Sequence, residues 1–215
     1  MEIKPIAIYR GPFGSKFGVP RQSSLANVEG RIVFHKEYCA KEALRGLEGF
    51  DRIWLIWEFS ANKEAKGEWQ PTVRPPRLGG NTAMGVFATR SPYRPNPLGL
   101  SCVELKGIEN GELIVKGADL MDGTPIYDIK PYLPYADSYP EAKASWATEA
   151  PKAKLKVVIP KGLNLEPELE EILALDPRPA YQEDPEKVYG MLYAGRDIKF
   201  KVKGDTLTVL SAERA

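Results

Sequence analysis

Residues 52–60, RIWLIWEFS, contain the continuous apolar run IWLIW and are rich in tryptophan and isoleucine. Aromatic and β-branched residues favour strands, and an unbroken apolar run indicates a strand that is buried rather than one at a sheet edge. The run IWLIW is far too short for a membrane helix, which needs about 20 apolar residues. The stretch therefore predicts a central strand of a folded sheet.

Further strand patterns surround this segment, and only one short helix accompanies them, at 40–50. The turn GIENGE at 107–112 joins two of the strands as a hairpin. Many strands with a single helix predict a closed or strongly curled sheet, and the absence of β-α-β alternation argues against a doubly wound nucleotide-binding fold. The expected strands are EIKPIAIY at 2–9, RIVFH at 31–35, AMGVFAT at 83–89, LSCVEL at 100–105, ELIVKGAD at 112–119 and IYDIKPY at 126–132.

The stretch at 138–153 consists mainly of small and polar residues, which breaks the strand pattern and predicts a linker. We place the boundary between a mainly β domain, 1–150, and a small α+β domain, 151–215. In the second domain we expect a strand at 154–160, a helix at 166–175 and a hairpin at 196–212. Lys199, Lys201 and Lys203 form a row on that hairpin, typical of a solvated or protected sheet edge. Contact with a phosphate backbone is the alternative.

The composition is that of an ordinary soluble globular protein, with 43% hydrophobic and 27% charged residues. Lys plus Arg number 30 against 29 for Asp plus Glu, so the net charge indicates no class of partner. The two cysteines form no CxxC motif and the N-terminus lacks a signal peptide, which favours a cytoplasmic protein. The single histidine, His35, excludes a histidine-rich metal site and is expected to be a partly buried strand residue.

The local charge is uneven. Between Trp69 and Val103 the chain has four arginines and no lysine or acid. Arginine suits forked recognition of carboxylate and phosphate, and the prolines and glycines of this span stiffen its loops. The pattern indicates an anion-binding surface, with solvated arginines on a proline-stiffened loop as a nearly equal alternative.

The stretch ATRSPYRPNPLGLS, 88–101, has three prolines. Arg94 and Asn96 each precede a proline, which favours extended backbone. In a straight extended chain Arg90, Arg94 and Asn96 share one face, so we expect a preformed binding loop. The following turn MDGTP, 121–125, is expected to be capped by its own Asp122.

Four ordered blocks resemble the TsaA/YaeB family: VPRQ at 19–22, RPPRLGGN at 74–81, GVFATRSPYRPNPLGLS at 85–101 and DGTPIYDIKPYLPYADS at 122–138. DPRPAY at 176–181 extends the resemblance to the second domain. The resemblance implies a homodimeric single-sheet β-barrel that uses S-adenosylmethionine to methylate tRNA. The implied target is N6 of threonylcarbamoyladenosine, beside the anticodon. A non-catalytic module binding S-adenosylmethionine or a nucleotide, and methyl transfer to another substrate, remain alternatives.

The resemblance also implies site residues. Arg21 or Arg90 would take the cofactor carboxylate, Leu100 the adenine face, and the backbone of 116–119 the adenine edge. A familiar member of the family has histidine and glutamine at the positions of Ser60 and Ala61. The implied cofactor-binding residues are Pro20, Arg21, Gln22, Ser60, Ala61, Arg90, Leu100, Lys116, Gly117, Ala118 and Asp119.

The RNA would be held by a second set of residues and by the C-terminal domain. Tyr93, Tyr132 and Tyr135 could stack on anticodon-loop bases or could simply pack against their surroundings. Because the N6 lone pair is delocalised, an acceptor would help, and Asn96 and Asp128 are the candidates. In the loop 88–101, Arg90 would face the cofactor, and Arg94 and Asn96 the RNA. The substrate-binding candidates are Arg74, Arg77, Tyr93, Arg94, Lys130 and Tyr132.

Overall fold

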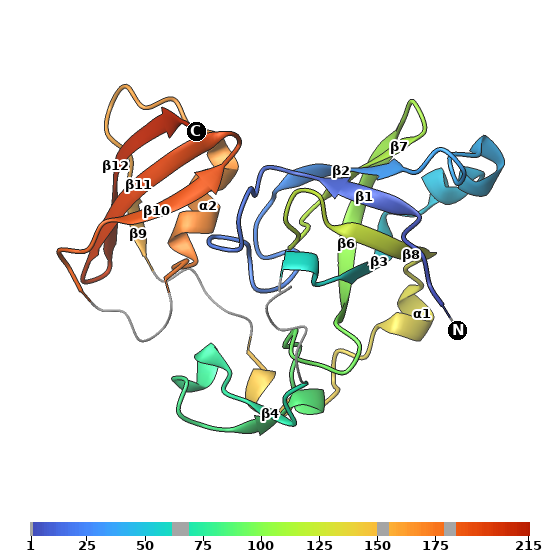
Figure 1. The fold of residues 1–215 in the computed structure, drawn as a ribbon, viewed down its shortest axis with the longest axis horizontal. Helices are drawn as coiled ribbons and strands as arrows, with labels where there is room; N and C mark the ends of the chain where they lie inside the picture. Colours follow the sequence, from blue (N-terminus) through green and yellow to red (C-terminus); the bar gives the residue numbers. More distant parts are fainter. Residues whose placement is uncertain (1, 62–68, 150–154, 179–183) are drawn as a thin grey trace.

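The computed structural model describes residues 2–61, 69–149, 155–178 and 184–215. Two sheets dominate it, with a closed barrel on the right of Figure 1 and a smaller open sheet on the left. The mainly β class and the barrel that the resemblance implied are confirmed. The predicted boundary at 150/151 and the last three residues of DPRPAY lie outside the described residues.

Six antiparallel strands close the barrel in the order β1-β2-β7-β6-β3-β8. Their alternate side chains fill one interior, which includes Tyr9, Leu113 and Ile126, all fully buried. The strands are β1 (Ala7–Arg10), β2 (Glu29–Phe34), β7 (Glu112–Lys116), β6 (Leu98–Glu109), β3 (Arg52–Glu58) and β8 (Pro125–Pro131).

The apolar segment at 52–60 does form a central strand, because β3 pairs with β6 on one side and with β8 on the other. Ile53, Leu55 and Trp57 point into the barrel, whereas the intervening residues are half-buried on its outside. The continuous apolar pattern thus reflects a barrel strand that is covered on both faces but fully buried on only one.

Two sequence predictions are wrong in detail. The helix expected at 40–50 is two 3-10 turns, Lys41–Leu44 and Leu47–Gly49. Gly46 separates them with a φ of 87°, a conformation that ends a helix. The strand expected at 83–89 is only β5 (Met84–Gly85), which pairs with β4 (Thr72–Val73). It gives way to a 3-10 turn at Val86–Ala88, which presents Phe87 outward.

The C-terminal part is a four-stranded sheet in the order β10-β11-β12-β9, packed against helix α2 (Pro167–Ala174). The predicted strand, helix and hairpin of this part are present, and β10 (Tyr189–Tyr193) is an additional strand. A short helix, α1 (Pro134–Asp137), follows the barrel. The other strands are β9 (Lys156–Val158), β11 (Arg196–Lys203) and β12 (Thr206–Arg214).

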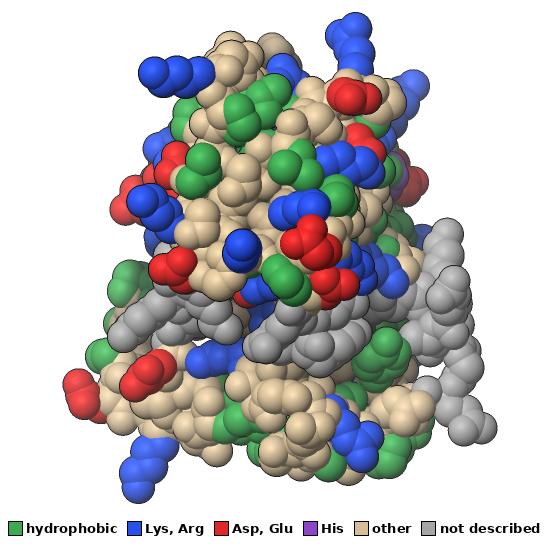
Figure 2. All heavy atoms as spheres, turned by 90° about the vertical axis from the view of Figure 1, so that its left-hand side faces the viewer, with side chains coloured by type: hydrophobic (Ala, Val, Ile, Leu, Met, Phe, Trp, Pro, Cys, Tyr) green, Lys and Arg blue, Asp and Glu red, His purple; other side chains and the backbone are tan. Residues whose placement is uncertain are grey.

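The lysine row of β11 is largely neutralised. Lys199 pairs with Asp197 at 2.7 Å and Lys201 with Glu186 at 3.2 Å. Acidic and basic side chains are interspersed over the upper body in Figure 2 rather than separated into a basic face. Because β11 pairs with β10 on one side and with β12 on the other, the row lies on a solvated face of the sheet, and its expected place at a protected edge is wrong.

The two parts share a hydrophobic core. The loop between β1 and β2 reaches from the barrel toward the C-terminal sheet (Figure 1), where Phe13, Ala26 and Val28 are buried with residues of α2 and β10–β12. Gly18 of this loop lies so close to Met191 that an added Cβ would be 1.8 Å from its sulfur. The loop that carries PRQ is therefore packed mainly by the C-terminal part.

Candidate functional site

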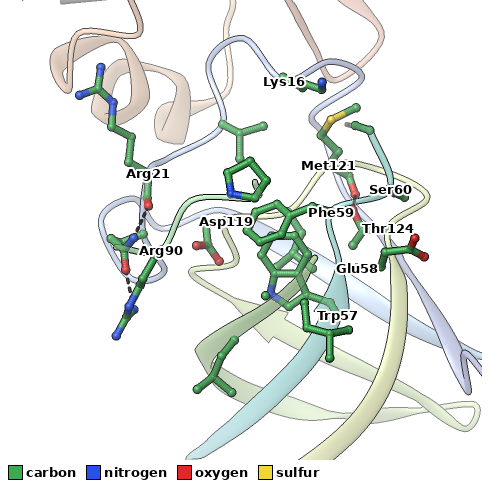
Figure 3. A pocket seen from close by; sticks show the side chains of 18 of the residues that line it. Lys16, Arg21, Trp57, Glu58, Phe59, Ser60, Arg90, Asp119, Met121 and Thr124 are labelled. Atoms are coloured by element: carbon green, nitrogen blue, oxygen red, sulfur yellow. Dashed lines mark hydrogen bonds between the residues drawn. The ribbon is translucent and has the colours of Figure 1, made fainter. Parts of the chain in front are cut away.

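A cavity of about 580 Å³ opens where β3 ends and β6 begins (Figure 3). Its volume lies in the range of small-molecule sites. Four separate segments of the chain meet there: the PRQ loop, the residues after β3, the loop that precedes β6, and the segment 119–124 that precedes β8. Of the predicted cofactor residues, it is lined by Pro20, Arg21, Gln22, Ser60, Ala61, Arg90, Leu100 and Asp119.

Aromatic side chains form one wall of this first cavity. The rings of Trp57 and Phe59 lie 4.4 Å apart between centroids, tilted by 59°. Gly99 pairs with Trp57 across the β3–β6 ladder, and a Cβ there would come within 2.2 Å of the indole. Glycine at this position is what lets the indole lie flat against β6. An apolar wall of this kind suits a planar heterocycle.

A hydrogen-bond chain runs from this wall to a carboxylate. The Trp57 indole N–H donates to the Ser101 hydroxyl at 2.9 Å, and that hydroxyl donates to Asp119 Oδ1 at 2.5 Å. Burial raises the pKa of the Asp119 carboxyl, while the hydrogen bond from Ser101 opposes that rise. Figure 3 shows Asp119 beside the Trp57 ring. The cavity thus has a fixed carboxylate that binds a proton more readily than an ordinary aspartate.

The two arginines of the first cavity differ in orientation. The guanidinium of Arg90 donates to Gln22 Oε1 at 2.5 Å, which joins the PRQ loop to the loop before β6. Arg21 points away from Trp57 in Figure 3, and its guanidinium donates to the Arg178 carbonyl at 3.4 Å. Both residues line the cavity, but Arg21 would need a different side-chain rotamer to bind an anion inside it.

The proline-rich loop is folded on itself, so the prediction of an extended segment is wrong. The Arg94 guanidinium donates to the carbonyls of Thr89 and Ser91, at 2.9 and 3.2 Å. These two residues flank Arg90 in the sequence, so Arg94 holds the backbone on both sides of Arg90. The Arg94 amide also donates to the Pro92 carbonyl at 2.8 Å, closing a tight turn. Arg94 therefore stabilises the loop internally and lines the first cavity instead of sharing an open face with Asn96.

A second cavity, of about 1310 Å³, adjoins the first and shares Arg21, Gln22, Thr89, Arg90 and Pro92 with it. The segment that follows α1 forms one side. There Trp146 donates to the Ala88 carbonyl at 3.2 Å, and its ring lies 6.0 Å from the Arg77 guanidinium carbon. Three of the predicted substrate residues, Arg74, Arg77 and Tyr93, line this second cavity.

Other predicted residues line neither cavity. Lys130 lies opposite Trp54 in the pairing of β8 with β3. Trp54 is three residues from Trp57 along β3, about 10 Å at ~3.3 Å per residue. Tyr132 packs beside Trp54 at 5.9 Å, and Tyr135 is exposed on α1. Asp128 forms an ion pair with Lys130 at 2.9 Å. Asn96 is exposed and likewise lies outside the residues that line the two cavities.

Gly117, which directly follows β7, holds the loop that carries PRQ instead of lining the cavity. The Gly117 amide donates to the Val28 carbonyl and its carbonyl accepts from the Ser24 amide, both at 2.8 Å. These bonds occupy the amide and the carbonyl of Gly117, one of the four residues whose backbone is expected to read the adenine edge. Of the predicted stretch Lys116, Gly117, Ala118 and Asp119, only Asp119 lines the first cavity.

The role expected for Asp122 was also wrong. Its carboxylate accepts from the Gly11 amide at 3.2 Å and pairs with Arg10 at 3.3 Å. The hydroxyl of Thr124 closes the turn by donating to the Met121 carbonyl at 2.8 Å. Asp122 therefore joins the turn to the end of β1.

Trp57, Phe59 and Ser101 line or support the first cavity, and Phe87 and Trp146 line the second, although none was singled out from the sequence. Among the described residues no group of three or more His, Cys, Asp or Glu could hold a metal ion. No helix in the described ranges is long and apolar enough to cross a membrane.

The barrel, the aromatic cavity with a fixed carboxylate and the adjoining arginine-lined cavity define a protein that binds small molecules and anions. The model of the tRNA-methyltransferase O N-terminal domain matches residues 8–138, and that of the TrmO C-terminal domain matches residues 143–215. The chain belongs to the tRNA-methyltransferase O family.

Individual relatives agree with this assignment. The tRNA (adenine(37)-N6)-methyltransferase of Escherichia coli is 43% identical over 99% of this chain and 97% of its own length. A putative S-adenosylmethionine-dependent methyltransferase of Pseudomonas aeruginosa is 41% identical over 88% of this chain and 87% of its own. A crystal structure of TrmO from that species superposes with a TM-score of 0.81 at 31% identity, covering 99% of this chain and 97% of that one.

Proposed function

We propose that the protein is an S-adenosylmethionine-dependent methyltransferase acting on N6 of adenine 37 in tRNA. The support comes from the Escherichia coli relative, which has this activity in its name and aligns with nearly the whole chain, and from the Pseudomonas aeruginosa relative, which is named a putative S-adenosylmethionine-dependent methyltransferase. The form of the base that carries a threonylcarbamoyl group, implied by the family resemblance, is the proposed substrate. Contact with the anticodon loop, a homodimeric state and a cytoplasmic location belong to the same proposal.

The single observation that carries the proposal is the convergence of PRQ and ATRS on the first cavity. Its residues fit S-adenosylmethionine, which has an adenine, a carboxylate and a cationic sulfonium that donates its methyl group. Trp57, Phe59 and Leu100 supply apolar surface for the adenine. Arg90 supplies a guanidinium for the carboxylate, and the carboxylate of Asp119 adds a negative charge.

The residues of this chain contribute orientation and a proton acceptor. Arg90, restrained by Gln22 and enclosed by the Arg94 loop, holds an anion in one place, and such positioning supplies much of the rate of an in-line transfer. Asp119 lies in the first cavity with a raised pKa, which makes its carboxylate a better acceptor for the N6 proton. Asn96 and Asp128 remain predictions for this role, but Asp119 has the better support.

The test is methylation of tRNA isolated from cells that lack the gene. The purified protein with methyl-labelled S-adenosylmethionine should label a modified adenosine in the anticodon loop, identified by mass spectrometry of nucleosides. Asp119→Asn should lower the rate at saturating substrates. If tRNA gained no label although calorimetry showed cofactor binding, the protein would instead be a binding module, and label on another RNA or a small molecule would reassign the substrate.

A further inference from the structure

Two large aromatic side chains lie stacked and exposed, and one of them, Phe87, lines the second cavity. The rings of Trp69 and Phe87 are 6.2 Å apart between centroids at an angle of 23°. Trp69 is 48% exposed and Phe87 is 72% exposed, although both are apolar enough to favour burial. The Arg94 guanidinium carbon lies 5.9 Å from the centre of the Phe87 ring. Phe87 is thus backed by neighbours, but most of its surface is uncovered.

The cavity that Phe87 lines is strongly positive. Arg21, Arg74, Arg77 and Arg90 line it, against one acid, Glu149. None of the four arginines forms an ion pair within the part of the chain that the structure describes, and Arg74 has no hydrogen-bond partner there either. Arginines without ion pairs around an aromatic ring are the features by which proteins hold single-stranded nucleic acid: the rings stack on bases and the guanidinium groups bind phosphates.

We propose that the second cavity binds an unpaired nucleotide of the substrate RNA next to the methylated one. Its base stacks on Phe87, which is supported by Trp69, and its phosphate is bound by Arg74. This inference rests on the proposed function. The two cavities share Thr89, Arg90 and Pro92, so a nucleotide in the second is a direct neighbour of a base entering the first. Stacking accepts any base, so this contact provides affinity and position with little sequence preference.

A second copy of the chain is the other occupant that exposed aromatic residues suggest. In a twofold interface the same surface meets itself, so each copy would bring its arginine-lined cavity toward that of the other. With one acid against four arginines, such a surface offers few partners of opposite charge. The charge favours an anionic polymer over a second copy.

The experiment compares Phe87→Ala with the wild-type protein and with Phe87→Tyr, which retains the ring. The probe is an RNA hairpin with the sequence of a tRNA anticodon arm, and its affinity is measured by fluorescence anisotropy. We expect Phe87→Ala to weaken RNA binding between about 5-fold and 150-fold, the range produced by loss of one base–aromatic stack, and Phe87→Tyr to remain near wild type. Cofactor affinity, from calorimetry, should be the same in all three.

A second measurement uses the tryptophan itself. RNA should quench the fluorescence of Trp69 in the wild-type protein, and Trp69→Phe should remove that part of the change. Arg74→Ala should reduce the slope of log affinity against log salt by about 0.7–0.9, the effect of one lost phosphate contact. Together these results would place both base and phosphate at the second cavity.

The inference is overturned if Phe87→Ala binds the hairpin as tightly as wild type while the wild-type protein methylates tRNA. It is also overturned if Phe87→Ala changes only the sedimentation coefficient, since the pair would then be a contact between two copies. Failure of the proposed function would look different, because the wild-type protein itself would not methylate tRNA.

Discussion

The carboxylate of Glu171 in α2 accepts hydrogen bonds from both the backbone amide of Asn27, at 2.9 Å, and its side-chain amide, at 3.0 and 3.1 Å. Asn27 lies at the end of the loop that carries Arg21 and Gln22. The same loop is held at its start, where the Ala194 amide donates to the Pro12 carbonyl at 2.8 Å. The C-terminal part thus holds both ends of a segment that lines the first cavity.

This arrangement predicts that Glu171→Ala weakens cofactor binding without contacting the cofactor. Loss of hydrogen bonds to a charged acceptor at an exposed site should cost about 1 kcal/mol of stability, and the freer loop should raise the cofactor Kd several-fold. Calorimetry and urea unfolding measure the two effects. Glu170→Ala, on the same helix and also exposed, is the matched control and should change neither. Equal cofactor affinity in the two variants would show that the contact between α2 and the loop does not affect cofactor binding.

Phe13 tests the shared core. Its ring is fully buried and meets Tyr193 edge-on at 5.3 Å. Phe13→Ala should therefore lower the free energy of unfolding by about 3–5 kcal/mol. Phe87→Ala, at an exposed position, should stay within roughly 0.5 kcal/mol of wild type. Urea denaturation of both variants decides this, and a loss below 1 kcal/mol for Phe13→Ala would mean that the loop is not part of the C-terminal core.

The sequence predicts the strands well where composition is decisive. The segment around Trp57 forms a central strand because its alternate positions fill the barrel and the others are covered outside. The segment around Phe87 fails as a strand because its backbone hydrogen bonds are local: the Thr89 amide bonds the Val86 carbonyl at 3.1 Å. Propensity cannot distinguish that turn from a strand, since both contain valine and phenylalanine.

Site residues are predictable only where they form a motif. PRQ and Arg90 reach the cavity together, but Ser101 reads as an ordinary strand residue until β3 and β6 pair. That pairing sets Leu55 opposite Ser101 and thereby brings the hydroxyl within 2.9 Å of the Trp57 indole. The wrong prediction of an extended backbone at Arg94 has the converse cause. Prolines favour extended backbone, yet the loop turns so that the carbonyls of Thr89 and Ser91 accept hydrogen bonds from the Arg94 guanidinium.

Arg90 should contribute more to cofactor affinity than other arginines of the region. Arg90→Ala should cost about 1.5–3 kcal/mol of binding free energy, the usual value of a charge-assisted hydrogen bond. Arg74→Ala is the control, because Arg74 lines only the second cavity and should leave cofactor affinity unchanged. Calorimetric titration with S-adenosylmethionine measures both. If Arg21→Ala were the only variant with a large effect, the cofactor carboxylate would be bound by Arg21 and not by Arg90.

Asp119 predicts a pH dependence of stability. Because burial raises its folded-state pKa above the ordinary 3.8, the protonated form is favoured in the native state. Its contribution to stability is therefore greatest below that ordinary value and falls as pH rises through the folded pKa. The Asp119→Asn side chain stays neutral at every pH, so the free energy of unfolding of this variant should increase relative to that of the wild type as pH rises from below 3.8 through the folded-state pKa. Parallel stability curves from pH 3 upward would contradict the burial of this charge.

Arg94 gives the most direct test of the folded loop. Arg94→Ala removes donors to the carbonyls on either side of Arg90, so it should weaken cofactor binding by about 1 kcal/mol, roughly fivefold. Arg94→Lys should restore little, because an ammonium group lacks the fork that spans two acceptors. Since this guanidinium is occupied within the loop, the salt dependence of RNA binding should keep the wild-type slope, whereas Arg74→Ala should flatten it. An Arg94→Ala variant with a flatter slope and normal cofactor affinity would show that Arg94 leaves the loop carbonyls and binds a phosphate.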